Sequence, residues 1–261
     1  TIYRRCKTYY GVLRMIYIEK EELPDSVKEK IIGLSKSEEW GNIDEKETDK
    51  IRSFFDNYFP KTEVKEVLVR EQKGLCAYCM RRIYRDSHCK IEHLVPLSRD
   101  KEKALDYHNL LGVCDGGEKS EKKYGRILCC DSHKKETEIT ITPYNSEQMK
   151  KIIYDSNGII STNPRDEIME KDINETLLLN GIRKEDGTIR DTSTEIVKGR
   201  KDAYDRARKM METLGRKNKC TSAVLKKIIV ETKSKQPLEE YVGVKLYYFQ
   251  RKYESLIKQG K

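Results

Sequence analysis

The sequence predicts an α-rich α+β fold in which a small zinc-stapled core lies between helical N- and C-terminal flanks. Cysteines gather in the middle of the chain, between Cys76 and Cys130, and the segments on either side carry apolar residues at intervals of three and four. Apolar runs within the cysteine-rich part are brief, as in short strands. We expect a helical segment over 1–61, the core over 62–145 and a mostly helical, basic region over 146–261.

The N-terminal part leads directly into the first cysteine pair. Residues 1–20 mix aromatic, basic and aliphatic side chains, a pattern that fits both a strand and an adapter segment. A helix entry follows at Leu23-Pro24-Asp25-Ser26, and a clearer helix is predicted over 44–59, where Pro60 ends it. A short amphipathic helix over 62–73 is then stopped by Gly74.

The core and the C-terminal part alternate brief extended runs with helices. We predict a strand over 91–97, a strand or loop over 106–113 and a charged insertion over 117–128. Asn157-Gly158 between the apolar runs 152–154 and 159–160 indicates a hairpin. Helices are predicted, in order, over 170–180, 195–214, 221–232 and 238–257.

Positive charge is concentrated in one block. The chain carries 53 basic and 44 acidic residues, a net charge of +9, and residues 198–235 alone hold 13 basic and 4 acidic ones. Such a block is typical of a surface that binds a polyanion, although a solvated helix face would have the same composition. No apolar run reaches the roughly 20 residues of a membrane span, and no signal peptide is visible, so we expect no membrane contact and a cytoplasmic location.

Eight cysteines in a lysine-rich chain without an export signal favour a metal over a disulfide framework. Cys76 and Cys79 form a Cys-x-x-Cys pair, which can direct two sulfurs to one zinc ion. Zinc requires four ligands, so Cys114 and either Cys129 or Cys130 would complete the site; the alternative is a set of buried thiols. Three further cysteines are expected to be bystanders: Cys6, Cys89 and Cys220.

The dipeptide Glu92-His93 lies within the apolar run that follows the first cysteine pair. Burying a carboxylate beside an imidazole costs several kcal/mol unless each finds a partner, so a functional role is favoured over simple packing. His88 and His108 lie in polar surroundings, and we expect no direct chemistry from either.

These motifs together resemble the His-Asn-His (HNH) endonuclease family, which has the ββα-metal fold. The resemblance is closest to the nuclease subunit of Septu (Ptu-type) antiphage systems, including versions associated with retrons, and it covers about residues 62–200. The motifs that carry it are Cys76-Ala-Tyr-Cys79, Ile91-Glu-His93, His108-Asn-Leu-Leu111, Cys130-Asp-Ser-His-Lys134 and the segment over 152–180.

The resemblance implies catalytic roles for the residues at the matching positions. His93 would be the general base, and Glu92 would bind a catalytic Mg²⁺ or Mn²⁺ ion. Asn109 would hold the loop that orients His93. Asp131 or His133 would be a further metal ligand, and the position of Asp131 directly after the last cysteine favours Cys130 as the fourth zinc ligand. Lys134 would contact phosphate.

The resemblance also implies partners. It predicts hydrolysis of phosphodiester bonds in DNA, with transfer RNA as an alternative substrate, and control by an ATPase subunit of the defence system, joined in retron versions by a reverse transcriptase and its multicopy single-stranded DNA. The flanking segments would provide docking surfaces for that partner. No Gly-x-x-x-x-Gly-Lys-Ser/Thr loop is present, so the chain itself is not expected to hydrolyse nucleotides.

The basic block suggests an alternative, non-catalytic function. Residues 198–235 could bind nucleic acid beside a zinc module that has only a structural role. In both interpretations four residues of the block are expected to contact phosphate: Arg200, Lys201, Arg206 and Arg208.

Overall fold

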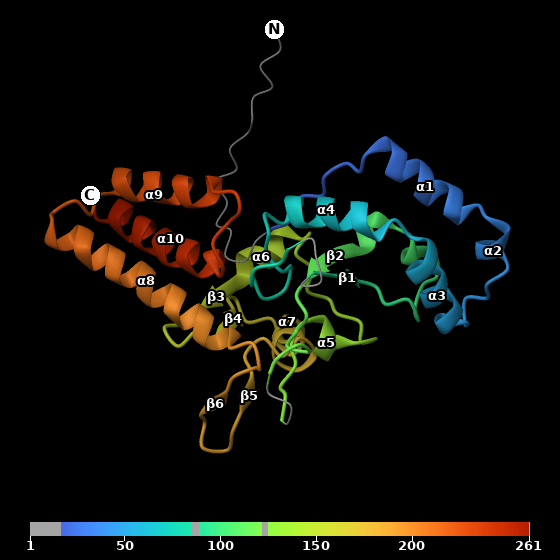
Figure 1. Cartoon of the computed structure of the whole chain (residues 1–261). Helices are drawn as coiled ribbons and strands as arrows, with labels where there is room; N and C mark the ends of the chain where they lie inside the picture. The colour runs from blue at the N-terminus through green and yellow to red at the C-terminus, as the bar shows by residue number, and fades with distance from the viewer. Residues whose placement is uncertain (1–16, 85–88, 122–124, 261) are drawn as a thin grey trace, which may run out of the picture.

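The computed structural model describes residues 17–84, 89–121 and 125–260. The expectations for Cys6, His88 and the segment 1–16 lie outside these residues. Figure 1 shows helices α1–α4 on one side of the molecule, helices α8–α10 on the other, and short strands and helices between the two groups. The α-rich α+β class is confirmed at this coarse level.

The N-terminal helices pack around aromatic side chains. They are α1 (Asp25–Ser35), α2 (Glu38–Gly41), α3 (Thr48–Tyr58) and α4 (Lys61–Glu71). The ring of Trp40 lies 4.9 Å from that of Phe54. Pro60 separates α3 from α4 because it lacks the N–H that a continuous helix would need. The apolar faces of α3 and α4 then cover the end of the central sheet.

The central sheet has two antiparallel strands, β1 (Lys90–His93) and β2 (Leu110–Val113), with His93 opposite Leu110. The loop between them carries 3₁₀ turns over Glu102–Ala104 and Tyr107–Asn109. Helix α5 (Asp131–Lys134) follows later in the chain. β1 is shorter than the predicted strand because the Val95 N–H donates to the side chain of Asn109 instead of a strand backbone, and Pro96 cannot donate.

The segment after the core contains small elements. These are α6 (Ser146–Lys151), the hairpin β3 (Ile152–Tyr154) and β4 (Ile160–Thr162), α7 (Glu167–Lys171) with a π-helical turn over Asp172–Thr176, and the hairpin β5 (Ile182–Arg183) and β6 (Ile189–Arg190). The hairpin predicted at Asn157-Gly158 is present, with Gly158 at φ +82°. The helix predicted over 170–180 starts earlier and ends at Thr176, and β5–β6 was not predicted.

Three long helices form the C-terminal part: α8 (Ile196–Arg216), α9 (Ser222–Ser234) and α10 (Val242–Lys258). A Cβ added at Gly199 would lie 2.3 Å from the Tyr241 ring, so this glycine permits the close approach at the start of α10. α10 begins after the predicted Leu238 because the Leu238 N–H donates to the carbonyl of Lys73, which fixes this residue against the end of α4.

Two hydrophobic clusters hold the molecule together. One extends from the cysteines to α8, α9 and α10, and the other joins α1–α4 to the loop between β1 and β2. Packing therefore crosses both predicted boundaries, near residues 61 and 145, and the three-part division stays a prediction. Among the described residues, no helix has the length and apolar character that crossing a bilayer requires.

Candidate metal centre and acid–histidine cavity

Four buried cysteines from three segments meet at one point. The Sγ atoms of Cys76, Cys79, Cys114 and Cys130 all lie within 4.8 Å of one another. The separations from Cys114 Sγ are 3.7 Å to Cys79 and 3.8 Å to Cys130. Four thiolates placed tetrahedrally about 2.3 Å from a zinc ion have sulfur–sulfur separations of about 3.8 Å. The cluster could therefore hold a metal such as zinc.

The structure distinguishes between the two adjacent cysteines. Cys130 is a member of the cluster, whereas Cys129 Sγ lies 3.7 Å from the carbonyl oxygen of Gly116 and 3.5 Å from Thr194 Oγ1. Cys130 adopts φ +57°, a left-handed backbone conformation, at the start of α5. Of the bystander cysteines, Cys89 and Cys220 lie outside the cluster.

Backbone contacts bring the ligands together. Cys76 N–H donates to the Arg81 carbonyl and closes the Cys-x-x-Cys turn, and Ala77 N–H donates to Gly112 in β2. Cys114 follows β2 directly. The Gly116 carbonyl accepts a hydrogen bond from the Cys129 N–H. This bond joins the two ends of the predicted insertion over 117–128, which therefore forms a closed loop. Gly116 lies at φ +58°, and a Cβ there would lie 2.3 Å from the Cys129 carbonyl oxygen.

Glu92 is 5% exposed and is held by two donors. Lys134 Nζ lies 2.8 Å and Tyr78 OH 3.2 Å from the same oxygen, Oε1. Burial and, next, the adjacent Asp131 raise the pKa of Glu92 to about 8, against the opposing effect of Lys134. Burial also disfavours ionisation of Asp131, but hydrogen bonding with Glu92 and the charge of Lys90 outweigh it and lower the pKa of Asp131. The two adjacent carboxyl groups therefore shift in opposite directions, with the proton favoured on Glu92.

His93 is held in one tautomer. Its Nε2 lies 3.0 Å from the carbonyl oxygen of Ala104, which can only accept, so Nε2 carries the proton and Nδ1 keeps its lone pair. The Phe55 ring of α3 contacts the imidazole at 4.7 Å in an edge geometry. Burial lowers the pKa of His93 to about 4, which keeps the ring neutral near pH 7.

Asn109 joins the two ends of the loop that holds His93. Its Oδ1 accepts from Val95 N–H at 2.8 Å, and its Nδ2 donates to the carbonyls of Val95 and Lys103 at 3.0 Å each. Lys103 immediately precedes Ala104, whose carbonyl accepts from His93. The amide thus supports the residue that fixes the histidine tautomer.

Asp131 and His133, the two alternatives for a metal ligand, occupy different surroundings. Asp131 lies beside Glu92 and forms an ion pair with Lys90 at 2.9 Å. His133 Nδ1 lies 2.9 Å from the Thr176 carbonyl instead. Within the described ranges, the four cysteines are the only group of three or more such side chains close enough to share an ion, so Glu92, Asp131 and His133 do not form a three-ligand site.

Glu92, His93 and Asp131 border one cavity of about 470 Å³. Arg52 of α3 and the exposed Lys135 also line it, and Arg52 pairs with Glu136 at 2.5 Å. The carboxylate pair is therefore surrounded by polar and charged groups from α3, β1, α5 and the loop after β2. Such convergence is typical of a binding site.

Two predicted phosphate contacts are wrong. Lys134 is 1% exposed, and its ammonium group is enclosed by Glu92 and by the carbonyls of His93 and Lys135. Arg200 is completely buried and donates to the carbonyls of Gly158 and Leu179. Both side chains hold segments together and neither is at the surface.

The three other predicted phosphate contacts in the block, Lys201, Arg206 and Arg208, are exposed, and two of them are paired with acids. Lys201 pairs with Asp205, and Arg208 pairs with Asp205 and Glu212, each one helical turn away. Lys198 pairs with Asp202 in the same way. Arg206 is exposed as well. A phosphate would therefore compete with acids of the same helix at most of these positions.

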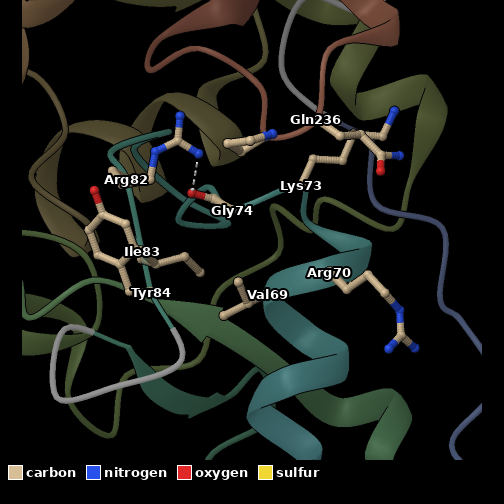
Figure 2. Close-up of a pocket in the computed structure, with 9 residues that line it drawn as sticks. Val69, Arg70, Lys73, Gly74, Arg82, Ile83, Tyr84 and Gln236 are labelled. Atoms are coloured by element: carbon tan, nitrogen blue, oxygen red, sulfur yellow. Dashed lines mark hydrogen bonds between the residues drawn. The ribbon is translucent and has the colours of Figure 1, made fainter.

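A larger cavity, of about 610 Å³, lies at the end of α4. Figure 2 shows Val69, Ile83 and Tyr84 on one side of it and the Arg82 guanidinium donating to the Gly74 carbonyl. Its described lining residues include cations but no carboxylate, imidazole or thiol. It therefore lacks the groups that acid–base or metal chemistry needs.

Three neighbours of the carboxylate pair were missed in the sequence: Tyr78, Lys90 and Arg52. Tyr78 lies inside the cysteine turn and Lys90 at the start of β1, where alternation with Glu92 places both side chains on one face of the strand. The spacing of two residues between Lys90 and Glu92 could have identified Lys90 as a neighbour of Glu92 from the sequence. Arg52 comes from α3, and no local pattern connects it to the site.

Comparisons with known proteins add no relative to this description. No protein-family model matches the chain, and no curated protein matches it. The chemistry of the site therefore has to be argued from its own residues and contacts.

Proposed function

We propose that this chain is a metal-dependent HNH endonuclease that hydrolyses phosphodiester bonds. The observation that carries the proposal is the shared cavity: His93, whose Nε2 contacts the Ala104 carbonyl, borders the same space as the adjacent carboxyl groups of Glu92 and Asp131. The order β1, β2, α5 is that required of a ββα-metal core and adds support.

The donor set fits a hard divalent cation. Glu92 and Asp131 provide adjacent carboxylate oxygens, which Mg²⁺ and Mn²⁺ prefer, and a cation there would favour the ionised form of both groups. Bound at this pair, the metal would stabilise negative charge on a phosphate and on the leaving oxygen. His93 takes a proton from water at Nδ1, while Ala104 and Asn109 hold the ring in place. Arg52 and Lys135 provide positive charge along the cavity wall.

Cleavage by the purified chain tests this proposal. Plasmid DNA and total transfer RNA are each incubated with Mg²⁺, with Mn²⁺ and with neither, because omitting the ions leaves a tightly held zinc in place. His93→Ala should lower the cleavage rate about 10²- to 10⁴-fold. His108→Ala is the matched control, since that imidazole is 76% exposed and outside the cavity. Equal rates for wild type and His93→Ala would overturn the catalytic role.

Glu92→Gln tests the metal. The amide keeps the shape of the side chain but loses the charge, so Mg²⁺-dependent cleavage should disappear while the zinc content stays at one ion per chain. Unchanged cleavage would exclude Glu92 as a ligand. If the chain binds the polymers but cleaves neither of them with any of the ions, a non-catalytic zinc module explains the result better.

We further propose, from the resemblance of the motifs, that the nuclease is the effector of an antiphage defence complex with an ATPase partner. Cleavage is therefore also measured with an ATPase subunit of such a system and with ATP. A change in rate or substrate on adding that subunit supports the proposal, whereas a lack of physical association contradicts it.

A further inference from the structure

A notch of about 310 Å³ lies between α8 and α10, in the part of the molecule that the proposed nuclease chemistry does not use. Its lining contains three tyrosines, one arginine, one lysine and one serine: Tyr204, Tyr247, Tyr248, Arg251, Lys252 and Ser255. Its volume is at the lower end of the range for small-ligand pockets and is sufficient for one nucleotide. Figure 1 shows that α8 and α10 lie side by side.

In the described part of the chain, the two cations of the notch lack the acidic partners that Lys198, Lys201 and Arg208 of α8 have. Within the described residues, neither Arg251 nor Lys252 forms an ion pair with an acid, although both are exposed. Arg251 instead donates to Tyr247 OH at 3.4 Å and lies 5.6 Å from the centroid of that ring. By contrast, Lys198, Lys201 and Arg208 are each paired with an acid of their own helix. An anion would meet less competition at the notch.

The aromatic side chains provide a second kind of contact. The rings of Tyr204 and Tyr248 lie 5.0 Å apart in an edge-to-face arrangement, and both are partly exposed and line the notch. Proteins that bind single strands combine cations for the phosphates with aromatic rings on which unpaired bases stack. An acidic peptide would use the cations but would gain little from the rings.

We propose that the notch between α8 and α10 binds one nucleotide of a single-stranded nucleic acid, with Arg251 and Lys252 on the phosphates and a tyrosine ring against the base. The inference deepens the proposed function, on which it rests for the identity of the polymer. It gives the substrate a contact on the helical part of the chain, outside the acid–histidine cavity.

Binding of a short labelled single strand, measured by fluorescence anisotropy without Mg²⁺ or Mn²⁺, tests the cations. Removing two phosphate contacts in R251A/K252A should weaken binding and reduce the slope of log affinity against log salt by about 1.4. K198A/K201A removes the same charge from acid-paired positions and is the matched control, with a smaller expected effect. Equal losses in the two double variants would overturn the site.

Stacking is tested with an oligonucleotide that carries abasic sites and has the same number of phosphates. Wild type should prefer the normal strand by about tenfold, and Tyr248→Leu should remove the preference while Tyr248→Phe keeps it. Equal affinity of wild type for both strands, or for a duplex of the same length, would overturn the single-strand assignment. An unaltered affinity in every notch variant would reject the proposal.

The two proposals can fail separately. If R251A/K252A cleaves nucleic acid and binds it as tightly as wild type, only the notch proposal is contradicted. Loss of binding in R251A/K252A, together with a chain that cleaves no polymer, would contradict only the nuclease. Thermal unfolding of each variant, followed by circular dichroism, confirms that these exposed substitutions leave the fold intact.

Discussion

The cysteine-rich centre and the C-terminal helices are stabilised by different means. In the centre, β1, β2 and α5 have four residues each, and such elements are marginal in water on their own. α8, α9 and α10 have 21, 13 and 17 residues, and they pack through apolar stripes. Where elements are too short to bury much surface, metal ligands can supply the missing folding free energy. Four substitutions, two in each region, test this difference.

The largest effect is expected from Cys130→Ser. Structural zinc contributes about 10–16 kcal/mol in small domains, so losing one of four ligands should abolish zinc retention and open the centre to proteolysis. Zinc content per chain and limited proteolysis measure this. Cys129→Ser is the matched control and should retain one zinc ion. If Cys129→Ser loses zinc and Cys130→Ser retains it, Cys129 is the fourth ligand.

Lys134→Met should have the next largest effect. It leaves the buried Glu92 without its cation, which costs about 3–5 kcal/mol of unfolding free energy above about pH 8, where this carboxyl is ionised. Mg²⁺ should restore part of the loss, because a cation at Glu92 and Asp131 compensates the charge. Urea unfolding with and without Mg²⁺ measures both quantities. A loss that Mg²⁺ leaves unchanged argues against a metal at this pair.

Arg200→Met tests the helical region at its one completely buried arginine. The substitution removes the donors of the Gly158 and Leu179 carbonyls, and each unsatisfied buried acceptor costs about 1–3 kcal/mol. We therefore expect a loss of about 3 kcal/mol in the free energy of unfolding, with zinc content unchanged. Loss of zinc in this variant would show that the two regions are not stabilised independently.

The smallest effect is expected from Lys201→Ala. The ammonium is half exposed and its pair with Asp205 is one helical turn away, so the unfolding free energy should change by no more than about 0.5 kcal/mol. The same urea titration measures it. A change as large as that for Arg200→Met would mean that surface charge, and not packing, stabilises α8.

The sequence was most informative where a signal is local. Periodicity gave α3, α4, α8 and α9 to within a few residues, and Asn157-Gly158 gave the β3–β4 turn, because both depend on neighbouring residues. The same periodicity could not reveal that Arg200 points inward. A buried arginine fits here because the Gly158 turn brings a carbonyl to it from 42 residues away.

The sequence by itself determined the chemistry available to this protein: cysteines at metal-ligand spacing, an acid–histidine pair and a basic C-terminal part. Only the tertiary structure decided which groups meet. It selected Cys130 over Cys129, placed Asp131 and not His133 beside Glu92, enclosed Lys134 and fixed the proton of His93 on Nε2. These outcomes depend on contacts between segments distant in the chain, which no local pattern of residues encodes.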